Sequence, residues 1–417
     1  MKHLLLILAL CGFFDARYPV FAQVWFQSSA PLADWNGVAS SADGTKLVAV
    51  CCPFFFDLDG VYVSTNSGAT WNITSAPNDP NTNSWTAVAS STDGVKLVAV
   101  AGGGDGAIYT SANSGLTWRK TSAPIDDYDC VASSADGTKL VAACNYGHGI
   151  YISIDSGANW VNTYNGRQFG GEFWHSVAIS ADGSKLVAAE GDGYVAGYPP
   201  SSCMLAYSTN SGVSWLVGNN VPADELWWAA ACSANGTVMV GAALHSYASS
   251  PIPGPIYISV DSGTNWTPTS SPLATWGCVA CSADGTKLTA GVIDGGITSP
   301  VGVYSSIDSG AHWTQDTNIF GANFIAYSAD GSMRVAADAY LYVSHSVSTP
   351  TLNIAHSGNN VLLYWATNQI GVVLQQKTNT TTPNWSSMTN IPTITNGQNN
   401  VLVSPSKQQA FYRLGSP

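Results

Sequence analysis

The amino-acid sequence predicts an all-β protein: a seven-bladed β-propeller closed by the N-terminal strand and followed by a small β-sandwich. Three observations lead to this prediction. A block that begins Ser-Ala-Asp-Gly recurs seven times, a second block that ends in Trp follows six of the copies, and both patterns stop near residue 349. Such a fixed repeat is the signature of an array of similar units. We expect a signal peptide over residues 1–22, the propeller over 23–349 and the small module over 350–417.

The composition favours strands over helices and argues against one class of partner. The 417 residues include 41 Gly and 15 Trp, and only 10% of them are charged. Val, Thr, Tyr and Trp favour strands, whereas Gly and Asn favour the tight turns between them. The net charge is −12 and no basic run occurs, so we expect no nucleic-acid partner.

The first 22 residues are typical of an export signal. An apolar run extends from Leu4 to Leu10, and Val20-Phe21-Ala22 offers a cleavage site with a small final residue. Asp15 and Arg17 interrupt the apolar segment, which is too short to anchor the chain across a bilayer, and no other stretch is apolar enough. We expect cleavage after Ala22, a secreted, periplasmic or cell-surface protein, and no transmembrane segment.

The cysteines indicate one candidate disulfide and no metal site. Eight cysteines remain after the signal, in a compartment that permits oxidation. Cys130 and Cys144 flank the turn at Asp136-Gly137 almost symmetrically, so a hairpin would set them opposite each other and allow a disulfide. Cys278 and Cys281 stand alone without the second pair that a zinc site needs. We expect neither a metal nor a cofactor.

The first repeated block, here named the hairpin turn, predicts two paired strands. Asp-Gly between two apolar runs is a strong hairpin signal, because Gly accepts the positive φ that the turn requires. The copies begin at Ser41, Ser91, Ser134, Ser180, Ser233, Ser282 and Ser328.

The second block, here named the tryptophan turn, has the form Ser-x-Asp/Asn-x-Gly-x-x-Trp and joins a third strand to a fourth. The Asp or Asn oxygen caps amides of the turn, Gly takes the left-handed position and Trp packs inward. We therefore expect a structural role for its Asp or Asn and for its Trp in each of the six copies. These residues are Asn66, Asn113, Asp155, Asn210, Asp261 and Asp308, and Trp71, Trp118, Trp160, Trp215, Trp266 and Trp313.

The first strand of each repeat is apolar on both faces. The sixth residue before the serine of the hairpin turn is aromatic in six repeats, and the third residue before it is Val, Ala or Ile in all seven. These positions point to opposite faces of a strand, so the sheet must be covered on both sides, as in stacked propeller blades. We expect the aromatic residues to lie between blades rather than at the mouth of a central channel. They are Trp35, Trp85, Tyr128, Trp174, Trp227 and Trp276.

The N-terminal strand is predicted to complete the seventh repeat. The seventh copy lacks a complete tryptophan turn. Residues 23–31, however, match the segment 71–77, which begins with the Trp of a tryptophan turn, and Trp25 corresponds to Trp71. Pairing of this strand with the last repeat would close the ring and remove an exposed sheet edge.

The tryptophan turn resembles the Asp-box, or BNR repeat, of sialidases, Asp-box endoglucanases, sortilin-type receptors and photosystem-II-assembly-factor-like propellers. The resemblance covers residues 23 to about 349 and implies that the turn is a structural hairpin away from any active site. The segment after residue 350 ends in Phe-Tyr-Arg-Leu and is similar to the C-terminal Ig/fibronectin-like modules of exported bacterial proteins. That second resemblance implies a role in attachment or sorting.

Candidate ligand-binding residues lie in the irregular loops between the second and third strands of the repeats. Variable loops on a rigid scaffold are the usual place for binding sites, and aromatic residues beside carboxylates suit sugars. The Asp-Gly pairs among them equally suit plain turns. The candidates are Asp105, Tyr146, His148, Glu190, Asp192, Tyr194, Tyr247 and Asp294.

Enzyme activity has weaker support in the sequence. The sialidase resemblance would imply an arginine triad, but the propeller segment has only Arg119, Arg167 and Arg334, and Arg119 directly follows a tryptophan turn, so we expect no sialidase activity. A glycosidase needs two carboxylates about 5–10 Å apart. Asp105, Glu190, Asp192, Asp294, Glu172 and Glu225 could supply such a pair.

The sequence thus leads to an exported, monomeric recognition protein that has no catalytic residues and binds a glycan or a protein on its irregular-loop face. A glycoside hydrolase with two loop carboxylates is the first alternative. An assembly scaffold for an envelope complex is the second.

Overall fold

The structure is a computed structural model in which every described element is a strand or a turn, and the described residues contain no helix. The predicted signal peptide over residues 1–22 lies outside the described part of the chain. The structure describes residues 24–56, 58–77, 84–103, 106–145, 149–164, 172–192, 203–222, 225–245, 252–293, 302–316, 318–345, 352–357, 360–366, 373–377, 386–388, 392–395, 398–404 and 411–415.

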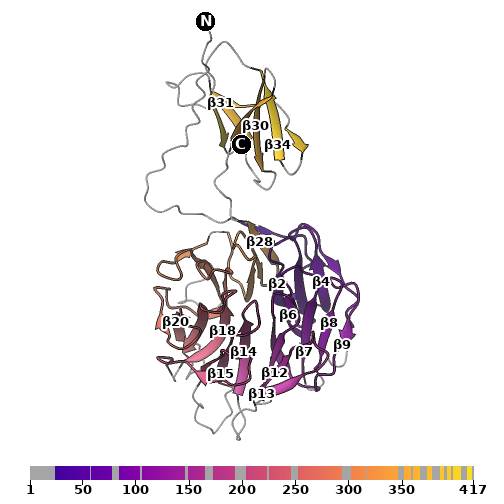
Figure 1. The fold of residues 1–417 in the computed structure, drawn as a ribbon, viewed down its shortest axis with the longest axis vertical. Coiled ribbons are helices and arrows are strands. Elements are labelled where there is room, and N and C mark those ends of the chain that lie inside the picture. Colours follow the sequence, from indigo (N-terminus) through magenta and orange to yellow (C-terminus); the bar gives the residue numbers. More distant parts are fainter. Residues whose placement is uncertain are drawn as a thin grey trace. The chain divides into compact units, whose positions relative to one another are not determined.

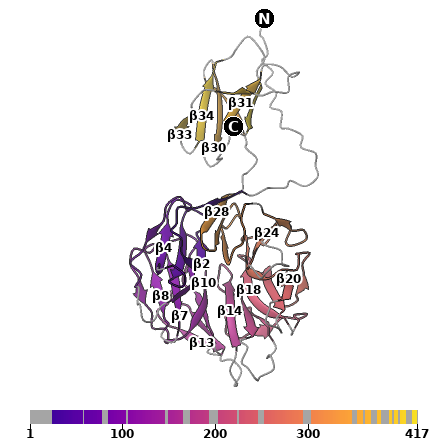
Figure 2. The same ribbon diagram turned by 180° about the vertical axis from the view of Figure 1, so that it is seen from behind.

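The chain divides into two compact units, of which one spans Ala22–His345 and the other contains Ser346–Pro417. The described residues of the first unit form seven four-stranded antiparallel sheets, which follow one another in chain order around a common centre (Figures 1 and 2). Within each sheet the strands are hydrogen-bonded in sequence order, except that the N-terminal strand joins the last sheet.

Each sheet of the first unit has a first, second, third and fourth strand, counted in the order in which the strands are hydrogen-bonded. The first strands are β2 (Asp34–Ser40), β6 (Ser84–Ser90), β10 (Tyr128–Ser133), β14 (Glu172–Ile179), β18 (Leu226–Cys232), β22 (Trp276–Cys281) and β26 (Phe324–Tyr327). The second strands are β3 (Leu47–Cys52), β7 (Leu97–Gly102), β11 (Leu140–Cys144), β15 (Leu186–Asp192), β19 (Met239–His245), β23 (Leu288–Val292) and β27 (Met333–Ala337). The third strands are β4 (Gly60–Ser64), β8 (Ile108–Ser111), β12 (Ile150–Ser153), β16 (Leu205–Ser208), β20 (Ile252–Ser259), β24 (Val303–Ser306) and β28 (Leu341–His345). The fourth strands are β5 (Asn72–Ile73), β9 (Arg119–Lys120), β13 (Val161–Tyr164), β17 (Leu216–Val217), β21 (Thr267–Pro268), β25 (Thr314–Gln315) and, in the last sheet, β1 (Val24–Gln27).

The first strands lie side by side in a closed circle. Each contacts the first strand of the next sheet, and β26 contacts β2. Backbone hydrogen bonds between the hairpin turns form a second closed circle. In each turn the residue after the serine donates its amide to the carbonyl of the equivalent residue in the next sheet. The donor and acceptor pairs are Ala42 to Thr92, Thr92 to Ala135, Ala135 to Ala181, Ala181 to Ala234, Ala234 to Ala283, Ala283 to Ala329 and Ala329 back to Ala42, at 2.7–2.9 Å.

Each hairpin turn is held by its buried serine. Ser41 is 1% exposed, donates its hydroxyl to Asp43 Oδ1 at 2.6 Å and accepts the amide of Lys46 at 3.0 Å. Gly44 has φ of +70°, the left-handed conformation that glycine adopts without strain. The same serine contacts recur in all seven turns, and in the fifth an Asn235 replaces the Asp.

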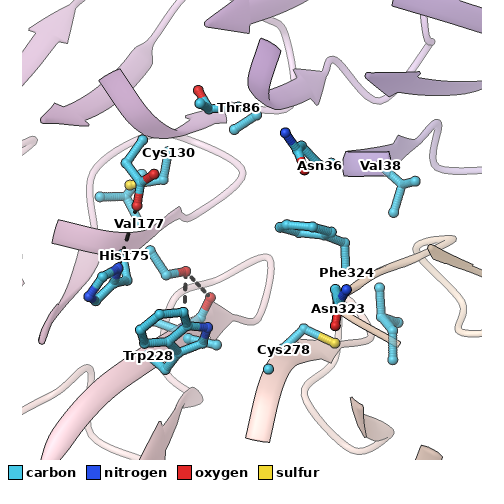
Figure 3. Close-up of a pocket in the computed structure, with 18 of the residues that line it drawn as sticks. Asn36, Val38, Thr86, Cys130, His175, Val177, Trp228, Cys278, Asn323 and Phe324 are labelled. Carbon is cyan, nitrogen blue, oxygen red and sulfur yellow. Dashed lines mark hydrogen bonds and ion pairs between the residues drawn. The ribbon is translucent and has the colours of Figure 1, made fainter. Parts of the chain in front are cut away.

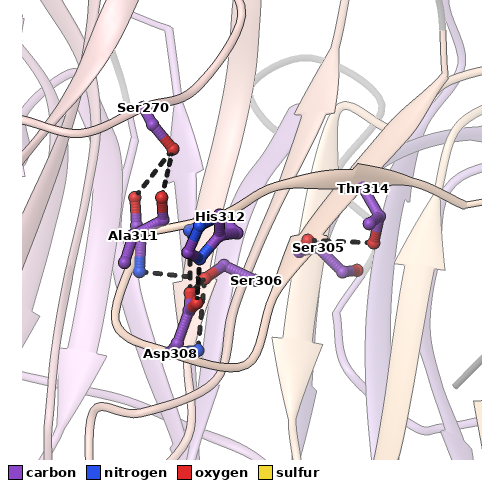
Figure 4. A network of polar contacts seen from close by, with 8 residues as sticks. Ser270, Ser305, Ser306, Asp308, Ala311, His312 and Thr314 are labelled. Atoms are coloured by element: carbon purple, nitrogen blue, oxygen red, sulfur yellow. Dashed lines mark hydrogen bonds and ion pairs between the residues drawn. The ribbon is translucent and has the colours of Figure 1, made fainter. Parts of the chain in front are cut away.

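The tryptophan turn joins its own sheet to the preceding one, as the sixth copy illustrates (Figure 4). Asp308 Oδ1 accepts the Ser306 hydroxyl at 2.8 Å and the His312 amide at 2.9 Å, and Ser309 and Gly310 both have left-handed φ values. The Ser309 amide donates to Thr286 in the hairpin turn of the same sheet. Ser270, which follows the fourth strand of the preceding sheet, donates its hydroxyl to the Ala311 carbonyl at 2.6 Å.

The N-terminal strand β1 pairs with β28 in the last sheet, with Trp25 opposite Ser344. Trp25 is 4% exposed and donates its indole N–H to Asp316 Oδ2 at 3.0 Å. Its ring lies 4.7 Å from the guanidinium of Arg334, which is 1% exposed and lies 3.1 Å from the same carboxylate oxygen. Arg334 occupies the position that Leu47 holds in the first sheet. The interface between the sixth and the last sheet therefore contains a buried ion pair covered by tryptophan, since Asp316 follows β25 and Arg334 lies on β27.

The predicted disulfide between Cys130 and Cys144 is absent, since both cysteines are free and buried. A β-bulge at Asp129 shifts the register of β10 and β11, so that Cys130 lies opposite Ala143 and Cys144 opposite Tyr128. Cys130 packs in the cluster that contains Trp174, whereas Cys144 packs in the cluster that contains Tyr128. The two side chains therefore face different neighbouring sheets, and the symmetric count along the sequence could not reveal the extra residue.

The second unit contains two antiparallel sheets whose strands share one buried cluster around Leu363, Trp365 and Leu374. One sheet has the order β29 (Asn353–Ser357), β30 (Asn360–Ala366), β34 (Gln398–Val403) and β33 (Thr393–Thr395). The other has the order β32 (Ser386–Ser387), β31 (Val373–Lys377) and β35 (Phe411–Gly415).

The first prediction concerns the closing strand. Replacement of Trp25 by Ala removes a buried ring and uncovers the Arg334–Asp316 pair, so we expect the free energy of unfolding to fall by about 3–5 kcal/mol. Replacement of the neighbouring Phe26, which is 51% exposed, should change it by less than about 0.5 kcal/mol. Urea unfolding of both variants tests this, and equal stability of the two would contradict the role of Trp25.

The second prediction concerns acid stability. The Ser134 hydroxyl and the Thr138 amide and hydroxyl hold the pKa of Asp136 at about 2, and Ser180 and Ser184 do the same for Asp182. The pKa of an Asp in the unfolded chain is about 3.9, so this stabilisation is complete above about pH 4 and is lost as the pH falls toward 2.

The matched test is the double variant D136N/D182N, which copies the natural Asn235 of the fifth turn. Its stability should depend less steeply on pH than that of the unmodified chain between about pH 4 and pH 2. Thermal unfolding across this range measures the difference. Parallel pH profiles for the two proteins would mean that these carboxylates do not stabilise the fold.

Candidate functional site

A pocket of about 410 Å³ lies at the centre of the circle of first strands (Figure 3). Every one of the seven first strands contributes to its wall. One layer of the wall is apolar and includes Val38, Val88 and Val131, and another carries polar and aromatic side chains such as Asn36, His175 and Trp228. We name this cavity the axial pocket.

A β-bulge recurs at the same place in six of the seven described sheets of the first unit, directly after the buried aromatic residue of the first strand. A bulge inserts one residue that has no partner on the neighbouring strand, and it re-aims the side chain at that position. All six bulge residues line the axial pocket. They are Asn36, Thr86, Asp129, His175, Trp228 and Gly277.

The aromatic residues before the bulges are buried between sheets, as the sequence analysis expects. Trp85, Trp174 and Trp227 are all 0% exposed and belong to clusters that combine two neighbouring sheets. The repeats therefore agree on the residue before the bulge and on the apolar residue two positions after it, but not on the bulge residue itself. Packing between the sheets therefore does not require one residue type at this position, and the side chain there can vary to serve ligand binding.

The polar end of the pocket lies on the irregular-loop side of the first unit. Asp34, near the start of β2, pairs with Cys52 at the end of β3, so the loop that follows Cys52 begins at the same end of the sheet as Asn36. In that loop Phe54 and Phe55 are 77% and 79% exposed, and the Asp34 carboxylate accepts the amides of Phe55 and Phe56. An exposed aromatic pair is thus held at the same end as the bulge residues.

Two bulge residues help to join neighbouring sheets. Asn36 donates its side-chain amide to the Trp85 carbonyl at 3.0 Å, and Thr86 donates its hydroxyl to the Tyr128 carbonyl at 2.7 Å. Gly277 leaves room for a neighbour, because a Cβ atom there would lie 2.3 Å from Ile293 Cγ1. These three positions serve the ring as well as the pocket.

Asp129, His175 and Trp228 form a separate group on consecutive sheets. His175 Nδ1 lies 3.5 Å from Asp129 Oδ2, and the His175 ring stacks on Trp228 with centroids 4.1 Å apart and an interplanar angle of 26°. Phe173 lies on β14 with its ring 6.4 Å from that of His175 and inclined by 21°. The side chains of His175 and Asp129 are 17% and 29% exposed. The stack holds Trp228 in one orientation while the carboxylate and imidazole stay accessible.

The charge and reactivity of the lining limit its chemistry. Asp129 is the carboxylate in the lining, which includes neither Lys nor Arg among the described residues. Burial raises the pKa of the Cys278 thiol to about 12, so that it stays protonated and is a poor nucleophile. The described residues include no group of three or more His, Cys, Asp and Glu side chains that could hold a metal ion.

Most of the predicted loop residues cannot be placed. The predicted residues that lie outside the described part of the chain are Asp105, Tyr146, His148, Tyr194, Tyr247 and Asp294. Asp192 ends β15, opposite Glu172, and its side chain is not described. Glu190 is 2% exposed within β15, opposite Trp174, and does not line the axial pocket.

Sequence reasoning missed the bulge residues, although a signal for them was present. The residue directly after the first-strand aromatic is polar or aromatic in five repeats that otherwise match closely. A comparison of the repeats by variability, rather than by similarity, would have identified it.

Comparison with known proteins supports the fold. No family model matches the chain, and no curated protein matches it. Among solved structures, a GH74 xyloglucanase from Xanthomonas campestris matches with a TM-score of 0.59 and 15% identity, over 82% of this chain and 59% of that one. YCF48 from Cyanidioschyzon merolae matches with a TM-score of 0.55 and 14% identity, over 77% of this chain and 98% of that one. A structure of YCF48 bound to a D1 peptide matches with a TM-score of 0.54 and 15% identity, over 82% and 99% of the two chains.

These neighbours are β-propellers, and at such low identity they establish the fold alone. The chain spans less than two thirds of the length of the matched xyloglucanase. None of the described residues belongs to a helix with the length and apolar character of a membrane span.

The third prediction tests whether the bulge position is free of the fold. Replacement of His175 by Ala should lower the free energy of unfolding by about 1 kcal/mol or less, because the side chain lines the pocket rather than an interface between sheets and its contact with Asp129 is partly solvated. Replacement of the adjacent Trp174 by Ala should cost about 3–5 kcal/mol, because a buried ring is lost. Chemical unfolding distinguishes them, and equally large losses would show that the bulge residue is structural.

Proposed function

We propose that this chain is an exported recognition protein without catalytic machinery, which binds a glycan or a protein on the irregular-loop face of a seven-bladed β-propeller. The observation that supports it best is the set of six bulge residues around the axial pocket. A repeat that keeps its packing residues and varies the bulge residue, which faces the pocket, is expected where a rigid scaffold serves binding.

Several observations support the propeller as a single closed ring of seven blades. The first strands meet in a circle, and the seven inter-turn hydrogen bonds end where they begin. The turn chemistry of Ser306 and Asp308 is that expected of an Asp-box, so we assign the repeats to the Asp-box type. We further propose that the two C-terminal sheets form a β-sandwich that serves attachment or sorting, and that the protein is a monomer.

Export is proposed from the sequence of residues 1–22. A protein released to the cell surface, the periplasm or the medium meets glycans and other proteins, and it meets little nucleic acid. The net charge of −12 suits this environment.

A glycoside hydrolase is the second candidate, and one backbone observation favours it. Glu172 and Asp192 lie directly opposite each other on β14 and β15. Retaining glycosidases use two carboxylic residues that lie close together, and these two residues are adjacent across the sheet. The structural likeness to a xyloglucanase is compatible with this candidate.

An assembly scaffold is the third candidate. The YCF48 structure whose fold this chain resembles holds a D1 peptide. Phe54 and Phe55 pair edge to face at 4.5 Å and are exposed, and an aromatic pair of this kind suits a protein surface.

The fourth prediction separates these functions. The full chain without its signal is applied to a glycan array, and every bound glycan is incubated with the protein and analysed for products. We expect binding without cleavage. Cleavage that disappears in the E172Q and D192N variants would replace our proposal with the hydrolase. An empty array with folded protein would exclude both and favour a protein partner.

A further inference from the structure

We propose that the axial pocket binds the end of a neutral saccharide chain, with Trp228 as its stacking platform and Asp129 as its hydroxyl acceptor. This inference rests on the proposed recognition function and names the class of ligand. It is drawn from the geometry of the wall, from its charge and from the His175–Trp228 stack.

The geometry of the wall selects a chain end. The pocket is lined by the first strands of all seven sheets, so protein surrounds it on every side. The middle of a polymer can lie in an open groove, but it cannot enter an enclosed ring. A volume of about 410 Å³ lies in the lower part of the range of about 300–1,000 Å³ for small-molecule sites, which suits a short terminal unit.

The charge of the wall selects a neutral ligand. Acidic sugars and the carboxylate end of a peptide need a cation, and the described lining offers neither Lys nor Arg. The carboxylate of the described lining, Asp129, lies beside His175 and is 29% exposed, so it can accept a hydroxyl proton. Sugar hydroxyl groups can both donate and accept hydrogen bonds. They therefore match the hydrogen-bond donors and acceptors in the lining, which are Asn36, Thr86, Asp129 and Asn323.

The aromatic side chains of the wall suit a sugar ring. Trp228 and Phe324 come from sheets on different sides of the axial pocket, and both line it (Figure 3). The stack with His175 at 4.1 Å restricts the Trp228 indole, so little entropy is lost when a ligand packs against it. His175 is in this view a positioning residue, because it orients both Trp228 and Asp129.

The test uses the full chain without its signal and neutral oligosaccharides of the cello, xylo, manno, malto and xyloglucan types, from disaccharide to polymer. Binding is measured by calorimetry. For a saccharide that binds, W228A should weaken the affinity about tenfold or more, because the stacking surface is lost; tenfold corresponds to about 1.4 kcal/mol. D129N, which keeps the shape of the side chain, should weaken it as well. The matched control F54A, on the exposed loop pair, should bind as the unmodified chain does.

Chain length provides an independent readout. Recognition of ends predicts that the number of sites per gram of saccharide falls as the chain lengthens, whereas recognition of internal segments predicts no such fall. The second result, or unchanged affinity of W228A and D129N, would overturn this inference while leaving the proposed function in place. Loss of binding in F54A alone would move the site to the loop pair and overturn it too. No binding of any saccharide by folded protein would overturn the inference and remove the glycan from the proposed function.

Discussion

The first unit depends on a circle of seven backbone hydrogen bonds between hairpin turns. Each sheet donates one amide to the next, and the bond from Ala329 to Ala42 returns to the start. A circle of identical bonds requires each turn to have the same geometry, which explains why its serine is buried and its glycine left-handed in every copy. With the turns fixed, the first strands are held at a constant distance from the centre. The axial pocket at that centre follows from this constraint.

One interface between neighbouring sheets, that between the sixth and the last sheet, is chemically different from the others. Six sheets have a buried Leu or Met, such as Leu47, at the position where the last sheet has Arg334. A buried Arg is costly unless it is paired, and here Asp316 and the Trp25 ring together provide the compensation. Such a polar interface specifies its partner strand more strictly than an apolar one, since only β1 brings the indole N–H that Asp316 accepts. The N-terminal strand is thereby directed to its place.

The sequence predicted the elements that repeat, because repetition reports constraints shared by all sheets. The aromatic residues of the first strands, the turns and the pairing of β1 with β28 follow from such matches. The Cys130–Cys144 disulfide failed because counting along the chain assumes regular pairing, and the bulge at Asp129 breaks it. Bulges at the same position of the other sheets also explain why the site was missed. A residue such as His175 differs from its counterparts in the other repeats, so a search for similarity passed over it, and the structure brings it beside Trp228.

The first strands serve both the stability of the ring and the lining of the axial pocket, through different residues. The neighbours of the bulge residues on the strand hold the ring together, while the bulge positions face the pocket and differ from sheet to sheet. The most direct test of this division is a crystal structure of the full chain with the neutral oligosaccharide that binds it most tightly. Our account predicts a terminal sugar in the axial pocket, in contact with Trp228 and Asp129. A saccharide bound on the exposed Phe54–Phe55 pair, with the axial pocket empty, would contradict it.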